Sequence, residues 1–172
     1  YIDDNPSLSV ADMNAKCRRI EDMGMVVIDY LQLMQSSGST TRYAGENRQQ
    51  VVADISRALK IMAKELHVPV LCLSQLSRAN ESRSDKRPML SDLRESGAIE
   101  QDADIVMMLH TERKNQSLTR TPVEVLVRKG RSSGTGTAYM IFDKPYADFT
   151  VDERGESWRD SFRQARRATD DL

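Results

Sequence analysis

The sequence lacks a glycine-rich phosphate-binding loop, because the pattern Gly-x-x-x-x-Gly-Lys-Ser/Thr occurs nowhere in its 172 residues. Lys129-Gly130 comes nearest, with the order of lysine and glycine reversed. The cysteines, Cys17 and Cys72, have neither the number nor the spacing of a disulfide framework or a zinc site, and we interpret them as reduced core thiols. No run approaches the roughly 18 apolar residues of a membrane-spanning helix, so we expect a soluble protein.

The chain also lacks a strong charge of either sign. Its 25 Lys and Arg and 26 Asp and Glu residues give a net charge of -1, although 30% of the residues are charged. Any nucleic-acid contact must therefore come from local basic patches. The 39% hydrophobic content can bury one sizeable core, so we expect one domain over 1–152 and a charged tail over 153–172, helical or disordered. The first residues, 1–4, look like the end of a strand and not like a natural N-terminus, so they carry no information on targeting.

The first half of the chain has the pattern of a β-α-β unit. A helix is predicted from Ser9 to Gly24, followed by a strand over Met25–Tyr30. A polar loop leads to a second helix over Arg48–Leu66, and Val68–Ser74 is an apolar run of strand length. The second helix has one apolar face, made of Val52, Ile55, Leu59, Met62 and Leu66. Two apolar strands joined by a long helix predict a parallel pair and an α/β fold.

The second half of the chain does not continue the β-α-β pattern. Residues 75–97 form a long charged segment, which we expect at the surface with one helical turn over 91–95. Residues 104–109 are another predicted strand. Residues 123–127 and 137–142 then predict an antiparallel hairpin around the glycine-containing turn 131–136.

Asp29 and Gln75 are the candidate site residues that the strand pattern itself indicates. Each follows an apolar strand, and the carboxyl ends of neighbouring parallel strands meet at one edge, where α/β proteins bind ligands. A carboxylate there can hold hydrated Mg²⁺, and an amide can bond a γ-phosphate or the attacking water. Asp29 alone could equally be a turn or N-cap residue, and Gln75 a polar strand terminus.

Four segments resemble the DnaB-type replicative helicases, with a likeness that extends over about residues 1–142. They are Ile28–Met34, Leu73–Arg78, Lys86–Pro88 and Ser91–Asp104. The resemblance implies a partial RecA-like P-loop NTPase core, a parallel sheet flanked by helices with a C-terminal antiparallel hairpin. It also implies ATP and Mg²⁺ as cofactors, 5′ to 3′ movement on single-stranded DNA, a homo-hexameric ring, contacts with primase and a helicase loader, and a cytoplasmic location.

The same resemblance assigns roles to individual residues. Asp29 matches the Walker B aspartate, which holds Mg²⁺ through water, and Gln75 matches the polar γ-phosphate sensor. Lys129 and Arg131 match the element that reaches the ATP of the neighbouring subunit, an arginine finger in trans. The loop that follows the DNA backbone in the ring channel corresponds to Arg94, Glu95 and Gly97, with the loop around 42–48 a weaker candidate.

The match departs from the family pattern at several places. Thr111 stands where many relatives have arginine, and the turn after Arg131 reads Ser132-Ser133-Gly134 where Asn-Gly is common. In this family the phosphate loop and catalytic glutamate precede the region present here. We therefore expect a fragment of a helicase, with no ATPase activity of its own. One alternative is a non-catalytic module that keeps only the DNA and subunit contacts. Another is a RecA-like recombinase or clock-type ATPase, which should lack the sequence motif at 92–104.

Overall fold

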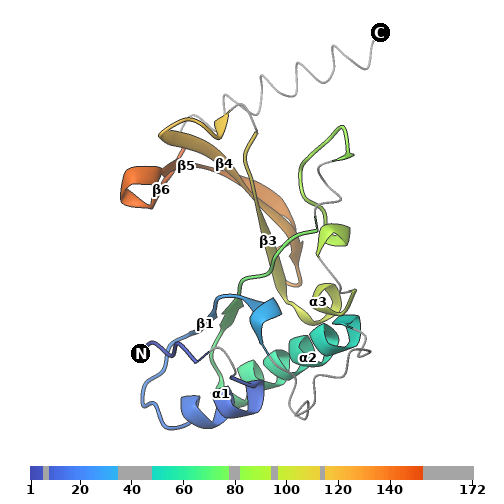
Figure 1. Ribbon diagram of the computed structural model, residues 1–172, viewed down its shortest axis with the longest axis vertical. Helices are drawn as coiled ribbons and strands as arrows, with labels where there is room; N and C mark the ends of the chain where they lie inside the picture. The colour runs from blue at the N-terminus through green and yellow to red at the C-terminus, as the bar shows by residue number, and fades with distance from the viewer. Residues whose placement is uncertain (6–7, 35–47, 78–81, 94–96, 113–114, 153–172) are drawn as a thin grey trace. The chain divides into compact units, whose positions relative to one another are not determined.

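The computed structural model describes residues 1–5, 8–34, 48–77, 82–93, 97–112 and 115–152. The chain divides into two compact units, Tyr1–Ala103 and Asp104–Leu172 (Figure 1). The proposed tail over 153–172 lies outside the described residues, so the boundary at 152 stays a prediction. Within the described part of the chain, no helix has the length and apolar character needed to cross a membrane.

A parallel β-α-β unit forms the centre of the first unit, as predicted. Strands β1 (Val26–Ile28) and β2 (Val70–Cys72) pair in parallel and are joined through helix α2 (Arg48–Leu66). Helix α2 packs against β2 and against helices α1 (Val10–Cys17) and α3 (Gly97–Asp102). Its predicted apolar face is the core of this unit, with four of the expected residues buried: Val52, Ile55, Leu59 and Met62.

Helix α1 begins where the sequence predicts and ends earlier. The Ser9 side chain accepts a hydrogen bond from the Asp12 amide at 3.2 Å, which caps the first turn. The predicted extension to Gly24 is wrong, because the helix ends at Cys17 and the chain then turns. Tight i to i+3 bonds follow, and Asp22 adopts a positive φ of 51°.

The N-terminal residues do not form the strand end that the sequence suggests. Residues 1–5 have no regular secondary structure, and Tyr1 and Ile2 are fully exposed. A strand needs a neighbour to satisfy its backbone groups, and none of the described strands pairs with these residues. The expectation of a strand at the start of the chain was wrong.

One side of the β1–β2 pair remains exposed. Val27 and Leu71 are partners in the register and are 60% and 41% exposed, and Met25 and Leu73 at the strand ends are exposed too. Parallel sheets are normally covered on both faces. The first unit therefore presents an apolar sheet face that the described residues leave uncovered.

The second unit is an antiparallel sheet larger than the predicted hairpin. Its strand order is β3-β4-β5-β6, with β3 at Ile105–His110, β4 at Arg120–Gly130, β5 at Gly136–Asp143 and β6 at Asp148–Val151. The hairpin β4–β5 is confirmed, while β6 was missed because it is short and follows a turn through Pro145. Phe142 and Phe149 stack across β5 and β6 with ring centroids 4.5 Å apart.

Candidate functional site

The carboxyl edge of the parallel pair carries Asp29 and Gln75, as predicted. Two backbone bonds continue the pairing past the strands: Leu73 N donates to Ile28 O and Leu31 N donates to Leu73 O, both at 2.9 Å. Asp29 follows β1 directly, joined to Tyr30 by a cis peptide bond, and Gln75 lies three residues past β2. Both residues are exposed at this edge.

Gln32 joins the two segments that leave this edge, and sequence reasoning missed it. Its Oε1 accepts a hydrogen bond from the Gln75 backbone amide at 3.2 Å, and its Nε2 donates to Ser74 Oγ at 3.0 Å. Gln32 stands three residues after Asp29, in the short helix η1 (Leu31–Leu33). The sequence signal that could have identified Gln32 is an amide side chain in the first turn after a candidate metal aspartate. Gln32 holds the backbone of the candidate sensor residue in place.

The Asp29 carboxylate fits a hydrated magnesium ion. It is exposed, and no hydrogen bond to it comes from the described part of the chain. Mg²⁺ keeps several waters and takes one or two carboxylates, so a dense cluster of ligands is not needed. The described residues hold no group of three or more His, Cys, Asp or Glu side chains placed to share a metal. Asp29 is the residue here that could contact the hydrated ion.

The charged segment after Gln75 is not simply a surface loop. Asp92 is only 2% exposed, and Pro88 is fully buried. Leu76 and Leu93 form an isolated antiparallel bridge, and the short helix η3 (Leu90–Asp92) overlaps the start of the helical turn expected over 91–95. Residues 94 and 95 of that turn lie outside the described residues. Most of the described residues of this segment are exposed or half-buried, as expected for a surface segment, but the sequence pattern did not reveal that one of its carboxylates is buried against an arginine.

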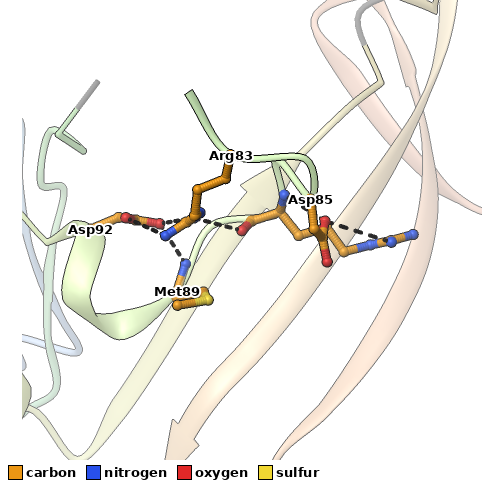
Figure 2. Close-up of polar contacts among 5 residues, drawn as sticks. Arg83, Asp85, Met89 and Asp92 are labelled. Atoms are coloured by element: carbon orange, nitrogen blue, oxygen red, sulfur yellow. Dashed lines mark hydrogen bonds and ion pairs between the residues drawn. The ribbon is translucent and has the colours of Figure 1, made fainter. Parts of the chain in front are cut away.

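That carboxylate belongs to Asp92, and Arg83 pairs with it through two hydrogen bonds (Figure 2). Arg83 Nη1 lies 2.9 Å from Asp92 Oδ1, and Arg83 Nη2 lies 2.5 Å from Oδ2. Burial raises the pKa of Asp92, but the hydrogen bonds from Arg83 and from the Met89 amide oppose this and leave the pKa below its ordinary value. The carboxylate is therefore ionised at neutral pH.

Part of the predicted DNA loop can be located. Arg94 and Glu95 lie outside the described residues, as does the weaker candidate loop around 42–47. Gly97 is the first residue of α3, and a Cβ built on it meets no atom within 4 Å. The roles assigned to these residues stay predictions.

Lys129 and Arg131 belong to the second unit, at the turn between β4 and β5. Lys129 pairs with Val106 of β3, and the Arg131 backbone amide donates to Asp104 O at 2.9 Å. The Arg131 Nε also lies 3.4 Å from the Asp104 carboxylate. Gly130 stands between the two basic residues in a confined position, where a Cβ would overlap Gly134 O and Ser133 Oγ.

Thr111, where the family resemblance led us to expect an arginine, is bonded within the same sheet. Its Oγ1 donates to the carbonyl of Pro122 on β4 at 2.9 Å. The hydroxyl thus ties the exit of β3 to β4. A threonine at this position fits the sheet well, but its short side chain cannot make the long-range contacts of an arginine.

The comparison with protein families decides the classification. A model described as the DnaB-like helicase C-terminal domain matches residues 1–151. The chain belongs to this family. Among curated relatives, it is 52% identical over 159 residues to the replicative DNA helicase DnaB of Geobacillus stearothermophilus, and 48% identical over 159 residues to the replicative DNA helicase DnaC of Bacillus subtilis. Each match covers 90% of this chain and 34% of the relative, so the chain spans about a third of their length.

Solved structures agree on a RecA-like helicase fold. A DnaB-like replicative helicase studied with its primase interactions superimposes with a TM-score of 0.77 and 42% identity, over 88% of this chain and 38% of that one. A second solved structure, described as an ATPase domain, gives a TM-score of 0.74 and 42% identity, over 86% of this DnaB-family chain and 52% of that domain. The fold class predicted from the sequence is therefore confirmed.

Proposed function

We propose that this chain forms the C-terminal part of the ATP-driven motor of a replicative DNA helicase, which assembles as a hexameric ring and moves 5′ to 3′ on single-stranded DNA. One observation carries the proposal. The parallel β1–β2 pair brings Asp29 and Gln75 to one sheet edge, in a chain that belongs to the DnaB family. This is the edge at which α/β folds bind their ligands.

The residues at this edge divide the work of phosphoryl transfer. Asp29 holds the water shell of Mg²⁺, and the Gln75 amide hydrogen-bonds the γ-phosphate or orients the attacking water. Gln32 keeps the Gln75 backbone in place through its 3.2 Å hydrogen bond. Mg²⁺ bound with ATP supplies neutralisation of the charge that develops on the phosphates.

Lys129 and Arg131 act on the ATP of the neighbouring subunit. They lie at a hairpin turn of the second unit, where the Arg131 side chain is 58% exposed and pairs with a carboxylate that is itself exposed. An arginine brought to the transferring phosphates stabilises their charge in the transition state. A role in trans predicts that hydrolysis needs an assembled ring.

Single-stranded DNA is the proposed substrate of the loop that contains Arg94, Glu95 and Gly97. A single arginine neutralises a phosphate, and a glycine lets backbone amides approach it, so such contacts do not depend on base sequence. We further propose primase and a helicase loader as partners. The solved helicase described with its primase interactions supports the first of these.

The chain alone does not provide a complete ATP site, because its sequence contains no phosphate loop. We expect the isolated 172 residues to show no ATPase activity that single-stranded DNA stimulates. The exposed apolar face of Val27 and Leu71 supports a role within a larger protein. Robust turnover by the pure chain would contradict this expectation.

A chimeric helicase tests the function directly. In the chimera, the present chain replaces the matching third of the Geobacillus stearothermophilus DnaB helicase, to which it is 52% identical. We expect hexamers, ATP hydrolysis stimulated by single-stranded DNA, and unwinding of a forked duplex from the 5′ tail. A folded hexamer that binds DNA but hydrolyses no ATP would favour the non-catalytic module instead.

A further inference from the structure

The segment between Gln75 and Gly97 contains an ion pair, between the half-buried Arg83 and the buried Asp92, that none of the proposed catalytic steps uses. Arg83 and Asp92 meet through two parallel hydrogen bonds, and the Asp92 side chain is 3% exposed. Charged groups are seldom buried unless a partner compensates them. Because a bidentate pair also fixes the relative orientation of its two groups, it suits a position that must be held in one geometry.

Asp92 is the centre of a small network that closes the segment on itself. Its Oδ2 accepts from the Met89 amide at 2.8 Å, while its backbone carbonyl accepts from the Ser77 amide at 2.8 Å. Arg83 Nη2 donates to the Arg87 carbonyl at 3.1 Å, so the arginine holds both ends of the turn (Figure 2). Every one of these contacts is internal to the first unit.

The network fixes the bridge between Leu76 and Leu93. The bond from Ser77 to Asp92 lies beside this bridge, because Ser77 follows Leu76 and Asp92 precedes Leu93. Gln75 immediately precedes Leu76, and Arg94 immediately follows Leu93 in the sequence. The candidate sensor and the candidate DNA arginine are therefore the sequence neighbours of the bridged pair.

We infer that Arg83 and Asp92 are positioning residues, which lock the Leu76–Leu93 bridge so that nucleotide state at Gln75 and DNA contact at Arg94 remain coupled. Neither residue touches ATP or DNA in this role. The inference rests on the proposed function of Gln75 and Arg94. It adds a specific mechanical element, built from one ion pair, to that function.

A role of the Arg83–Asp92 pair in stability alone predicts a different result from a positioning role. If the pair only stabilised the fold, its removal would lower ATPase with and without DNA in parallel, along with the yield of folded rings. A positioning role predicts that basal ATPase persists while its stimulation by DNA is lost. Coupling between two sites is typically worth about 5- to 150-fold in affinity, which is large enough to measure.

The test uses the chimeric helicase with Arg83→Met and Asp92→Asn together. This variant removes both charges at once, so no buried charge is left without a partner, and the new asparagine can still accept from the Met89 amide. We expect hexamers with basal ATPase within about twofold of the parent and stimulation by single-stranded DNA reduced about fivefold or more. Arg83→Lys keeps the charge but cannot form both hydrogen bonds to the carboxylate, so it should lose part of the stimulation.

A matched control lies on the same segment. Asp85 and Arg87 form an ion pair at 4.0 Å, in which the Asp85 side chain is 59% exposed, so Asp85→Asn should leave the stimulation unchanged. Equal stimulation in the double variant and in Asp85→Asn would overturn the inference, as would a parallel fall of basal and stimulated rates. An unsubstituted chimera without stimulation by DNA would instead refute the proposed function, so the two failures are distinguishable.

Discussion

Arg131 and Asp104 lie side by side, with the arginine Nε 3.4 Å from the aspartate Oδ1 and a backbone hydrogen bond of 2.9 Å from Arg131 to Asp104. The backbone bond anchors the turn to the residue before β3. The side-chain pair is more than half exposed on both sides, and such pairs contribute only about 0–1 kcal/mol to stability. The guanidinium can therefore exchange Asp104 for a phosphate at little cost, which is what a finger in trans requires.

Replacement of this arginine should abolish hydrolysis without unfolding the protein. In the chimeric helicase, we expect Arg131→Ala to lower ATPase by about 10³-fold or more, because an arginine finger contributes about 10³ to 10⁵ to the rate in other NTPases. Arg120→Ala is the matched control, since the Arg120 side chain is 66% exposed and lies 3.7 Å from the Asp143 carboxylate at the other end of β4. Steady-state ATPase and thermal melting of both variants check the prediction.

Mixed rings separate action in trans from action in cis. Rings that combine Arg131→Ala subunits with Asp29→Ala subunits should regain part of the activity, because an Asp29→Ala subunit can supply its intact arginine to the intact ATP site of an Arg131→Ala neighbour. If Arg131 acts within its own subunit, every subunit of such a ring is defective and no activity returns. Unchanged ATPase in rings made only of Arg131→Ala subunits would remove the finger assignment altogether.

Gly130 should be the residue that tolerates substitution least in the turn between β4 and β5. A Cβ at this position would overlap Gly134 O and Ser133 Oγ, and the first of these is backbone that cannot move alone. We expect Gly130→Ala to destabilise the fold by about 1–3 kcal/mol, the usual range for overpacking, and to lower ATPase. Gly136→Ala, with no atom within 4 Å of its Cβ, is the control. Equal melting temperatures for the two variants would contradict the prediction.

Asp29→Asn should separate catalysis from stability. The carboxylate is exposed and, among the described residues, receives no hydrogen bond, so its loss should change the free energy of unfolding by no more than about 0.5 kcal/mol. The ATPase of the chimeric helicase should nevertheless fall to background at all Mg²⁺ concentrations. Calorimetry and Mg²⁺ titration of the rate provide the measurement. Activity restored by higher Mg²⁺ would point to a weaker, indirect role.

The sequence predicted those parts of the fold that depend on local periodicity. Helix α2 has the predicted bounds, Arg48–Leu66, because one apolar face repeats along its whole length. The parallel pairing followed from two apolar runs joined by that helix. By the same reasoning, Asp29 and Gln75 had to emerge at one edge of the sheet.

What the sequence did not predict depends on contacts between distant residues. Arg83 and Asp92 are nine residues apart in a charged stretch, and nothing in their spacing distinguishes a buried pair from solvated charges. Gln32 and Ser74 meet only because β1 and β2 are neighbours. Strand β6 has four residues and pairs with β5 across the turn that contains Pro145, so it is too short to show an alternating pattern in the sequence.

Arg94→Ala should weaken DNA binding in a way that salt reveals. Each phosphate contact on a single strand contributes about 0.7 to the slope of log K against log salt concentration, so the slope should become shallower by about that amount. Basal ATPase should remain. Fluorescence anisotropy with labelled oligonucleotides at several salt concentrations measures the slope. A variant whose slope equals that of the parent would place the DNA contact elsewhere in the chain.

The Cys72 thiol should react slowly with labelling reagents at neutral pH. Burial raises the pKa of its thiol to about 11, and a backbone hydrogen bond from Leu31 offsets this only partly. Because the thiolate is the reactive form, labelling at pH 8 should be roughly 10² times slower than for a free cysteine with a pKa near 8.5. The rate should rise about tenfold per pH unit until the pH approaches 11. Cys17→Ser isolates Cys72, and guanidinium-unfolded protein gives the reference rate. Equal rates in the folded and unfolded states would show that the thiol is not shielded in the β1–β2 pair.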